Sequence, residues 1–273
     1  MKRLAILLFA AVSCREKSES TEPTLPENSD PSFHPSVSMA PRDAARSVDS
    51  NLPGPARAAA AAARVRPLLE TDLRKKGLHF GDPVFLRAFK EENELEIWMR
   101  GRETGRFRHF RTYPVAAASG ELGPKLSEGD GQVPEGFYRV DREAFKPDSD
   151  FHLAFNIGYP NAFDRAHSRT GSFIMIHGRD RSIGCLAMTD PLIEEIYTLC
   201  AAALEEGQPS FQVHVFPFRM TDNRMARAAD NEWFAFWTNL RVGFDRFEES
   251  HIPPRVTVDE GNYTFSKPDD DQE

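Results

Sequence analysis

The segment Ile174-Met175-Ile176-His177-Gly178-Arg179-Asp180-Arg181-Ser182-Ile183-Gly184-Cys185-Leu186 holds most of the information about fold and chemistry in this chain of 273 residues. An apolar run typical of a buried strand ends at His177, and Cys185 follows eight positions later, directly after a glycine. A thiol is a good nucleophile only as a thiolate, and a neighbouring imidazole can accept its proton. The spacing therefore indicates Cys185 as a nucleophile and His177 as its base.

The residues beside this pair fit the same chemistry. Gly184 leaves backbone N–H groups free to face a developing oxyanion. Arg179 and Arg181 bring positive charge that favours a thiolate or holds a substrate carboxylate. A histidine and a cysteine in one chain are more often structural, so the pair alone also fits a packed core.

The chain on both sides of this segment is rich in short apolar runs separated by polar or glycine-rich turns. Such runs predict strands, and the glycine-rich stretch 120–136 predicts a loop that shapes a groove. The predicted strands span residues 84–89, 95–99, 107–118, 137–140, 151–157, 173–176 and 211–216. This pattern indicates a mostly β domain with flanking helices, an α+β fold, over residues 57–250.

Three helices are predicted around these strands. The first spans residues 58–76, and Pro67 is expected to break or restart it. The second is capped by Asp190 and continues to about residue 206. The third is capped by Asn231, and large apolar residues recur along it every three or four positions. This apolar stripe predicts core packing rather than a ligand site.

The two ends of the chain differ in composition from this domain. Residues 1–14 form a predicted signal peptide in which a basic start and a short apolar run precede Ala11-Val12-Ser13-Cys14. That ending resembles a lipobox, so either Cys14 is the site of lipid attachment or ordinary cleavage follows Ser13. Both alternatives predict an exported protein of the periplasm or cell envelope. Residues 15–56 predict a disordered linker, and residues 251–273 an acidic tail.

Composition argues against several other classes. The net charge of −8 disfavours phosphate binding, so no nucleic-acid partner is expected. His152 and His167 could join His177 and Cys185 as metal ligands, but zinc-binding spacings are absent, and neither a metal nor another cofactor is expected.

Cys200 is expected to be a packed core thiol and His214 a structural residue. The basic cluster Arg100, Arg102, Arg106, Arg108 and Arg111 predicts a solvated face, or one that meets the carboxylates of a substrate.

Several separated motifs together resemble one known family. They are His177-Gly178, Ser182-Ile183-Gly184-Cys185-Leu186-Ala187-Met188-Thr189-Asp190, Asn156-Ile157-Gly158-Tyr159-Pro160-Asn161, Leu122-Gly123-Pro124-Lys125-Leu126, Glu128-Gly129-Asp130-Gly131-Gln132, Pro134-Glu135-Gly136-Phe137-Tyr138 and Val215-Phe216-Pro217-Phe218-Arg219-Met220. The chain resembles the YkuD-type L,D-transpeptidase catalytic domain over about residues 64–247, in its YafK-like branch.

The resemblance implies a β-sandwich-type catalytic domain that acts on peptidoglycan stem peptides in cell-wall biogenesis and cell shape. It implies that Cys185 attacks the amide after the third stem residue and forms a thioester. His177 would be the base, oriented by the carbonyl of Gly178, and the N–H groups of Gly184 and Cys185 would bind the oxyanion. The residues expected to bind substrate are Arg179, Arg181, Ser182, Asn156 and Tyr159.

Three departures from the commoner family pattern leave the acceptor open. Ile183 stands where that pattern has histidine, Ala187 stands where arginine or asparagine is frequent, and the separation of His177 and Cys185 is shorter. All three fit the YafK-like branch, which is also associated with hydrolysis. The expected transferase therefore has an alternative, a hydrolase or amidase that releases a wall-attached peptide or lipoprotein. A non-catalytic peptidoglycan-binding protein and a plain cysteine peptidase are further alternatives.

Overall fold

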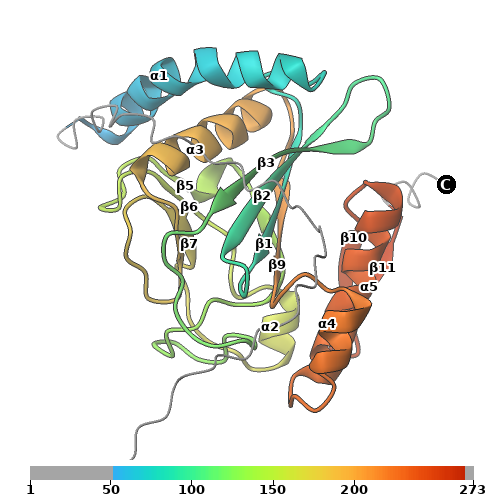
Figure 1. Ribbon diagram of the computed structural model, residues 1–273. Coiled ribbons are helices and arrows are strands. Elements are labelled where there is room, and N and C mark those ends of the chain that lie inside the picture. The colour runs from blue at the N-terminus through green and yellow to red at the C-terminus, as the bar shows by residue number, and fades with distance from the viewer. Residues whose placement is uncertain (1–51, 268–273) are drawn as a thin grey trace, which may run out of the picture. The chain divides into compact units, whose positions relative to one another are not determined.

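The computed structural model describes residues 52–267 (Figure 1). The predictions for the signal peptide, for Cys14, for nearly all of the linker and for the last acidic residues lie outside this range. None of the helices between residues 52 and 267 has the length and apolar character that crossing a membrane requires.

A five-stranded sheet forms the centre of the domain, in the order β3-β2-β1-β9-β4. Only β1 and β9 pair in parallel; the other neighbours are antiparallel. Its strands are β1 (Val84–Phe89), β2 (Glu94–Arg100), β3 (Phe107–Pro114), β4 (Gly136–Val140) and β9 (Phe211–Phe216). Five of the predicted strands are therefore confirmed, although the third ends at Pro114 instead of residue 118.

A second, four-stranded sheet has the order β5-β6-β7-β8. Its strands are short, and β7 pairs in parallel with β8. They are β5 (Phe145–Lys146), β6 (Ala154–Asn156), β7 (Met175–His177) and β8 (Leu186–Ala187). The predicted strand 151–157 corresponds to the much shorter β6, and the predicted strand 173–176 to β7, which begins two residues later.

The central strands are buried on both faces because a different layer covers each face. In β1, Leu86 and Ala88 point into a core shared with the second sheet, while Phe85 and Phe89 point to the opposite side. Every residue of β1 is buried, which is the pattern of a strand covered on both faces. Two sheets that share one core, with helices around them, confirm the predicted α+β class.

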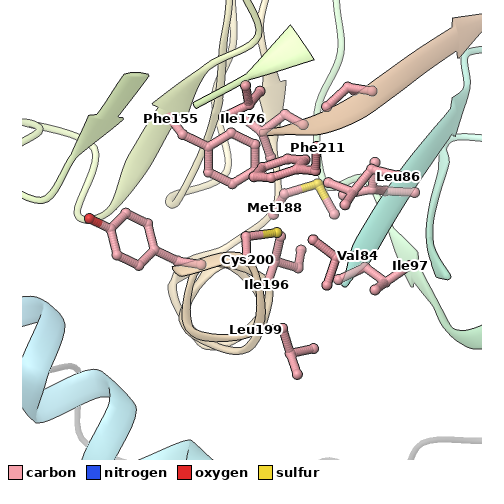
Figure 2. Close-up of a cluster of buried hydrophobic side chains, with 14 of the residues drawn as sticks. Val84, Leu86, Ile97, Phe155, Ile176, Met188, Ile196, Leu199, Cys200 and Phe211 are labelled. Carbon is pink, nitrogen blue, oxygen red and sulfur yellow. The ribbon is translucent and has the colours of Figure 1, made fainter. Parts of the chain in front are cut away.

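Helix α3 (Asp190–Glu205) packs against both sheets, and α1 (Gly54–Lys75) packs against α3 (Figure 1). Figure 2 shows Ile196 and Cys200 of α3 beside Phe155 and Phe211, which come from the two sheets. The thiol of Cys200 is fully buried, and burial raises its pKa far above the usual range. The prediction that it is a packed core thiol is confirmed.

The opposite face of the large sheet is covered by helix α5 (Phe234–Ser250) and by a hairpin of β10 (Arg255–Asp259) and β11 (Asn262–Ser266). The apolar stripe of α5 packs onto this face, as predicted. Shorter helices complete the domain: α2 (Ala162–Ala166), α4 (Asp222–Arg227) and the 3-10 turn η1 (Arg142–Ala144).

The hairpin corrects the prediction that the acidic tail begins at residue 251. Val256 and Val258 alternate with polar residues on β10, and Tyr263 and Phe265 alternate on β11. Alternation of this kind lets one face of a hairpin bury itself. Tyr263 is almost fully buried against the aromatic residues under α5, so the folded domain includes this part of the chain.

Four local predictions about helices also need correction. Helix α1 begins at Gly54, inside the predicted linker, and passes through Pro67 without interruption. The N-cap of α3 is Thr189 and not Asp190 as predicted. The Asp190 side chain instead accepts a hydrogen bond from the N–H of Arg179. Asn231 accepts a hydrogen bond from the Trp233 N–H, three residues before α5 begins.

Candidate active site

The register of β7 against β8 brings the histidine and the cysteine together. Ile176 lies opposite Leu186, so Cys185, one residue earlier, lies level with Met175. The N–H of Met175 accordingly points to the Cys185 sulfur at 3.3 Å. Residues 178–185 form the connection between these parallel strands, so both side chains of the predicted pair lie at its two ends.

An open cavity of about 850 Å³ lies over these strand ends. His177 and Cys185 both line it, together with Arg181 and Ser182. The remaining lining residues are Ala117, Ser149, Asp150, Phe151, Phe173, Met175, Asp180 and Ile183. A second cavity, of about 540 Å³ between α1 and α3, has no histidine or cysteine in its lining.

The His177 ring is fixed by its own backbone neighbour. Its Nδ1 lies 2.6 Å from the carbonyl oxygen of Gly178, so Nδ1 is the protonated nitrogen of the neutral ring and Nε2 is left as an acceptor. Burial lowers the pKa of His177, and the hydrogen bond to Gly178 opposes this to a lesser extent. At neutral pH the ring is therefore uncharged and able to accept a proton.

Glycine at position 178 is required by close packing. A Cβ there would lie 2.6 Å from Oδ1 of Asp190 and 2.8 Å from the carbonyl oxygen of Phe151. Both contacts are shorter than real Cβ atoms make, so a larger residue would displace the turn that follows His177. The predicted role of Gly178 beside the histidine thus has a steric basis as well as a hydrogen bond.

The Cys185 thiol is only partly exposed. Its sulfur lies 3.7 Å from the carbonyl oxygen of Phe173, which can accept a hydrogen bond from the thiol. Burial raises the pKa of the Cys185 thiol, while the N–H of Met175 and the positive charge of Lys125 lower it by less. The resting sulfur is therefore a neutral thiol that loses its proton only when a base accepts it.

Two serine hydroxyls hold the backbone of the cysteine turn, and both bear on the predicted oxyanion donors. The N–H of Gly184 donates to Ser119 Oγ at 2.6 Å, and the N–H of Cys185 donates to Ser182 Oγ at 2.8 Å. Ser182 in turn donates to the carbonyl oxygen of Cys185. Neither amide is free in this structure, so an oxyanion would have to replace a serine oxygen as the acceptor.

Ser119 is a residue that the sequence did not single out. It follows β3 in the glycine-rich region, and its hydroxyl also donates to the carbonyl oxygen of Gly131 at 2.7 Å. It lies 65 positions from Gly184 along the chain, and the sequence around it has no motif that links the two. Only folding brings it to the cysteine turn.

The other residues predicted to bind substrate are divided. Arg181 and Ser182 line the cavity, whereas Arg179, Asn156 and Tyr159 are not part of its lining. The Arg179 guanidinium lies over the ring of Phe151, 5.7 Å from its centre. Asn156 accepts a hydrogen bond from the N–H of Gly158, and the buried Tyr159 hydroxyl donates to the carbonyl oxygens of Lys125 and Thr170. The last two residues therefore stabilise loops instead of facing the cavity.

The mouth of the cavity has an apolar rim. The exposed fractions of Phe151, Phe173 and Ile183 are 44%, 67% and 85%. Phe173 also has a positive φ of 56°, a conformation that bulky residues rarely adopt. Exposed apolar side chains that gather around a cavity are typical of a binding site.

Among residues 52–267, no group of three or more histidine, cysteine, aspartate or glutamate side chains could hold a metal ion.

Comparisons with known proteins point to one family. A model of the YkuD family, the L,D-transpeptidase catalytic domain, matches residues 86–215. A protein of Escherichia coli K12 with the provisional name L,D-transpeptidase YafK is 46% identical over 188 residues, which are 69% of this chain and 76% of that protein. The protein of the same name from Escherichia coli O157:H7 aligns with the same values.

Solved structures show a weaker likeness. The helical cell shape determining protein Pgp2 of Campylobacter jejuni is 18% identical, with a TM-score of 0.40 over 70% of this chain and 80% of that one. Bd1075 of Bdellovibrio bacteriovorus is 17% identical, with a TM-score of 0.36 over 66% and 78% of the two chains. TM-scores this low support no inference about function.

Proposed function

The chain belongs to the YkuD family of L,D-transpeptidase catalytic domains, and we propose that it is a cysteine-dependent L,D-transpeptidase of peptidoglycan stem peptides. One observation supports this most directly. The parallel pairing of β7 and β8 places Cys185 and His177 in the lining of one open cavity, with the Nε2 atom of the imidazole left as an acceptor.

The proposed first half-reaction forms a thioester. His177 Nε2 accepts the proton of the Cys185 thiol as the sulfur attacks the carbonyl carbon of the third stem residue. The C–N bond of the amide then breaks, and the leaving amine takes the proton from the imidazolium. The oxyanion would displace a serine oxygen from the N–H of Gly184 or Cys185.

In the second half-reaction an acceptor amine attacks the thioester carbon and loses a proton to His177. The C–S bond then breaks, and the imidazolium returns the proton to the departing Cys185 sulfur. Arg181 lies in the cavity lining, where its charge can hold a stem-peptide carboxylate. Ser182 acts on the backbone of Cys185, so we assign it a positioning role in place of the predicted contact with substrate.

One observation favours a second function, a hydrolase that uses water as the acceptor and releases a wall-attached peptide or lipoprotein. The apolar rim formed by Phe151, Phe173 and Ile183 suits a polypeptide with apolar side chains better than a bare stem peptide. The chemistry up to the thioester is the same for both functions, so the two differ only in the second half-reaction.

Mass spectrometry after incubation with a carbapenem tests the shared step. We expect one covalent adduct on Cys185, because β-lactams of this class acylate the nucleophile of this family. The adduct should be lost in Cys185→Ala and retained in Cys200→Ala, whose thiol is buried in the core. If no adduct forms on a folded protein, the chain is a binding protein and the enzyme proposal is wrong.

Product analysis with purified wall fragments then separates the two acceptors. Cross-linked dimers would support the transpeptidase, whereas free stem peptides or a released polypeptide would support the hydrolase. The same fragments incubated with Cys185→Ala give the background. Neither product above that background would contradict both functions.

We further propose that the protein works outside the cytoplasm, attached through Cys14 if the lipobox is used. Membrane partition of Cys14→Ser tests the attachment. A variant that stays as membrane-bound as the parent would exclude a lipid on that cysteine.

A further inference from the structure

Helix α1 lies before the residues that the family model matches, 86–215, and is nevertheless fastened to one wall of the candidate active site. That wall is the loop 148–152, of which Ser149, Asp150 and Phe151 line the cavity. Two side chains of α1 reach this region, and each acts on a different part of it.

The first fastening is made by Arg57. Its Nη1 donates to the carbonyl oxygen of Ser149 at 2.9 Å and to that of His152 at 2.8 Å. The start of the helix also lies directly on the loop, since a Cβ on Gly54 would be 2.7 Å from the backbone nitrogen of Asp148. One guanidinium therefore fixes both ends of the segment that contains Phe151.

The second fastening holds the side chain of His152, which is buried and has a positive φ of 71°. Its Nε2 lies 2.9 Å from Oε1 of Glu194 on α3. The other oxygen of Glu194 lies 3.2 Å from Nε of Arg64 on α1. A single buried carboxylate thus joins α1, α3 and the loop.

The loop in turn contacts the predicted base. The ring of Phe151 lies 4.8 Å, centre to centre, from the imidazole of His177. The Phe151 carbonyl oxygen is so close to Gly178 that a Cβ there would lie 2.8 Å away. Because the Phe151 side chain is 44% exposed, packing alone does not hold it, and its position depends on the backbone that Arg57 fixes.

We propose that Arg57 is a positioning residue for the reaction, acting through residues 149–152 to keep the Phe151 ring against the His177 imidazole. Helix α1 is then part of the catalytic unit. This inference rests on the proposed function, in which His177 is the base.

The test replaces Arg57 by alanine and measures two quantities. We expect kcat/KM to fall about ten- to a hundredfold, since small displacements of a catalytic group are costly. We also expect the NMR titration of the His177 ring to move upward, because a loosened loop lets water reach the imidazole and removes part of the burial that lowers its pKa.

Two further variants separate positioning from a general loss of structure. Arg66→Ala removes an arginine from the same helix that is exposed and paired with Glu70, so it should change neither quantity. Phe151→Ala should shift the His177 titration as Arg57→Ala does. Adding Arg57→Ala to Phe151→Ala should then cause little further change in the His177 titration.

A folded Arg57→Ala protein with the parent's His177 titration and kcat/KM would show that the proposal is wrong. If Arg57→Ala does not fold, Arg57→Met serves instead, because it keeps an apolar stem of similar length but has no N–H group that could donate to the two carbonyl oxygens. The titration needs no turnover. If His177→Ala and Cys185→Ala keep full activity, the proposed function fails while the coupling of Arg57 to His177 is still measured.

Discussion

At the scale of single residues, the candidate nucleophile and base are both neutral at rest. Burial lowers the pKa of His177 and raises that of Cys185, so proton transfer between them before substrate binds is unfavourable. General-base catalysis during attack fits these shifts better than a preformed thiolate–imidazolium pair. The cavity therefore favours a thiol that reacts when a substrate carbonyl is in place.

The pH dependence of kcat/KM follows from the lowered pKa of His177. Only the neutral ring accepts a proton, and burial keeps it neutral below the ordinary value of 6.5. The acid midpoint of kcat/KM should therefore lie below pH 6.5. Steady-state rates measured with a soluble muropeptide, with folding checked at each pH, would show this. An acid midpoint at or above 6.5 would contradict it.

Gly178→Ala should reduce both activity and stability. The added methyl would meet Asp190 and the Phe151 carbonyl at distances that force the turn to move, which typically costs about 1–3 kcal/mol. Urea denaturation and the carbapenem reaction would measure the two effects. Gly101→Ala is the matched control: its φ is not positive, and its Cβ would make only ordinary contacts of 3.4 Å or more. Equal losses in the two variants would contradict the steric argument.

At the scale of elements, the β10–β11 hairpin completes an aromatic layer. The Tyr263 ring stacks on Phe163 at 4.2 Å and meets Phe137 edge to face at 4.8 Å. Its hydroxyl accepts a hydrogen bond from Asn161 at 2.8 Å. This one side chain thus joins the hairpin to α2 and to β4, on the face of the sheet that α5 covers.

Tyr263→Ala should lower the free energy of unfolding by about 3–5 kcal/mol, the usual cost of removing a buried aromatic ring. Chemical denaturation followed by tryptophan fluorescence would measure it. Asn262→Ala changes the exposed neighbouring residue in the same strand and should have little effect. A loss below about 1 kcal/mol for Tyr263→Ala would mean that the hairpin contributes little to stability.

At the scale of the whole molecule, stability depends on polar groups sealed between the large sheet and α5. His214 is fully buried, and its Nε2 lies 2.9 Å from Oε1 of Gln212. The rings of Phe85 and Phe137 both meet the His214 ring edge to face, 4.6 Å from it centre to centre, and no hydrogen bond reaches its Nδ1. Burial lowers the pKa of His214 well below its usual range, and the charge of Arg87 adds to this.

Stability should therefore fall in acid. The unfolded chain binds a proton at residue 214 near pH 6.5, whereas the folded chain binds it only at lower pH. Below about pH 6.5 the free energy of unfolding should decrease, by up to about 1.4 kcal/mol per pH unit from this group. His214→Leu should flatten this part of the stability curve, as measured by urea denaturation at several pH values. An unchanged slope would show that His214 does not control it.

Local sequence patterns were sufficient to predict most of the helices and strands and the candidate catalytic pair. The apolar runs, the end of the first helix near residue 76 and the stripe on α5 depend on neighbours within a few positions, and so does the compact His177–Cys185 motif. The hairpin was missed because its alternating residues lie among acidic ones. The prediction that Pro67 breaks the first helix was wrong because a helix held by tertiary packing tolerates a proline.

The tertiary structure alone decided which groups meet. Ser119 reaches the amide of Gly184 across 65 positions, and Arg57 reaches the carbonyl of His152 across 95. Asn156 and Tyr159 belong to the family motif and yet do not line the cavity. Local preferences are set by short-range sterics and solvation, whereas contacts between distant segments depend on how the two sheets and α3 share one core.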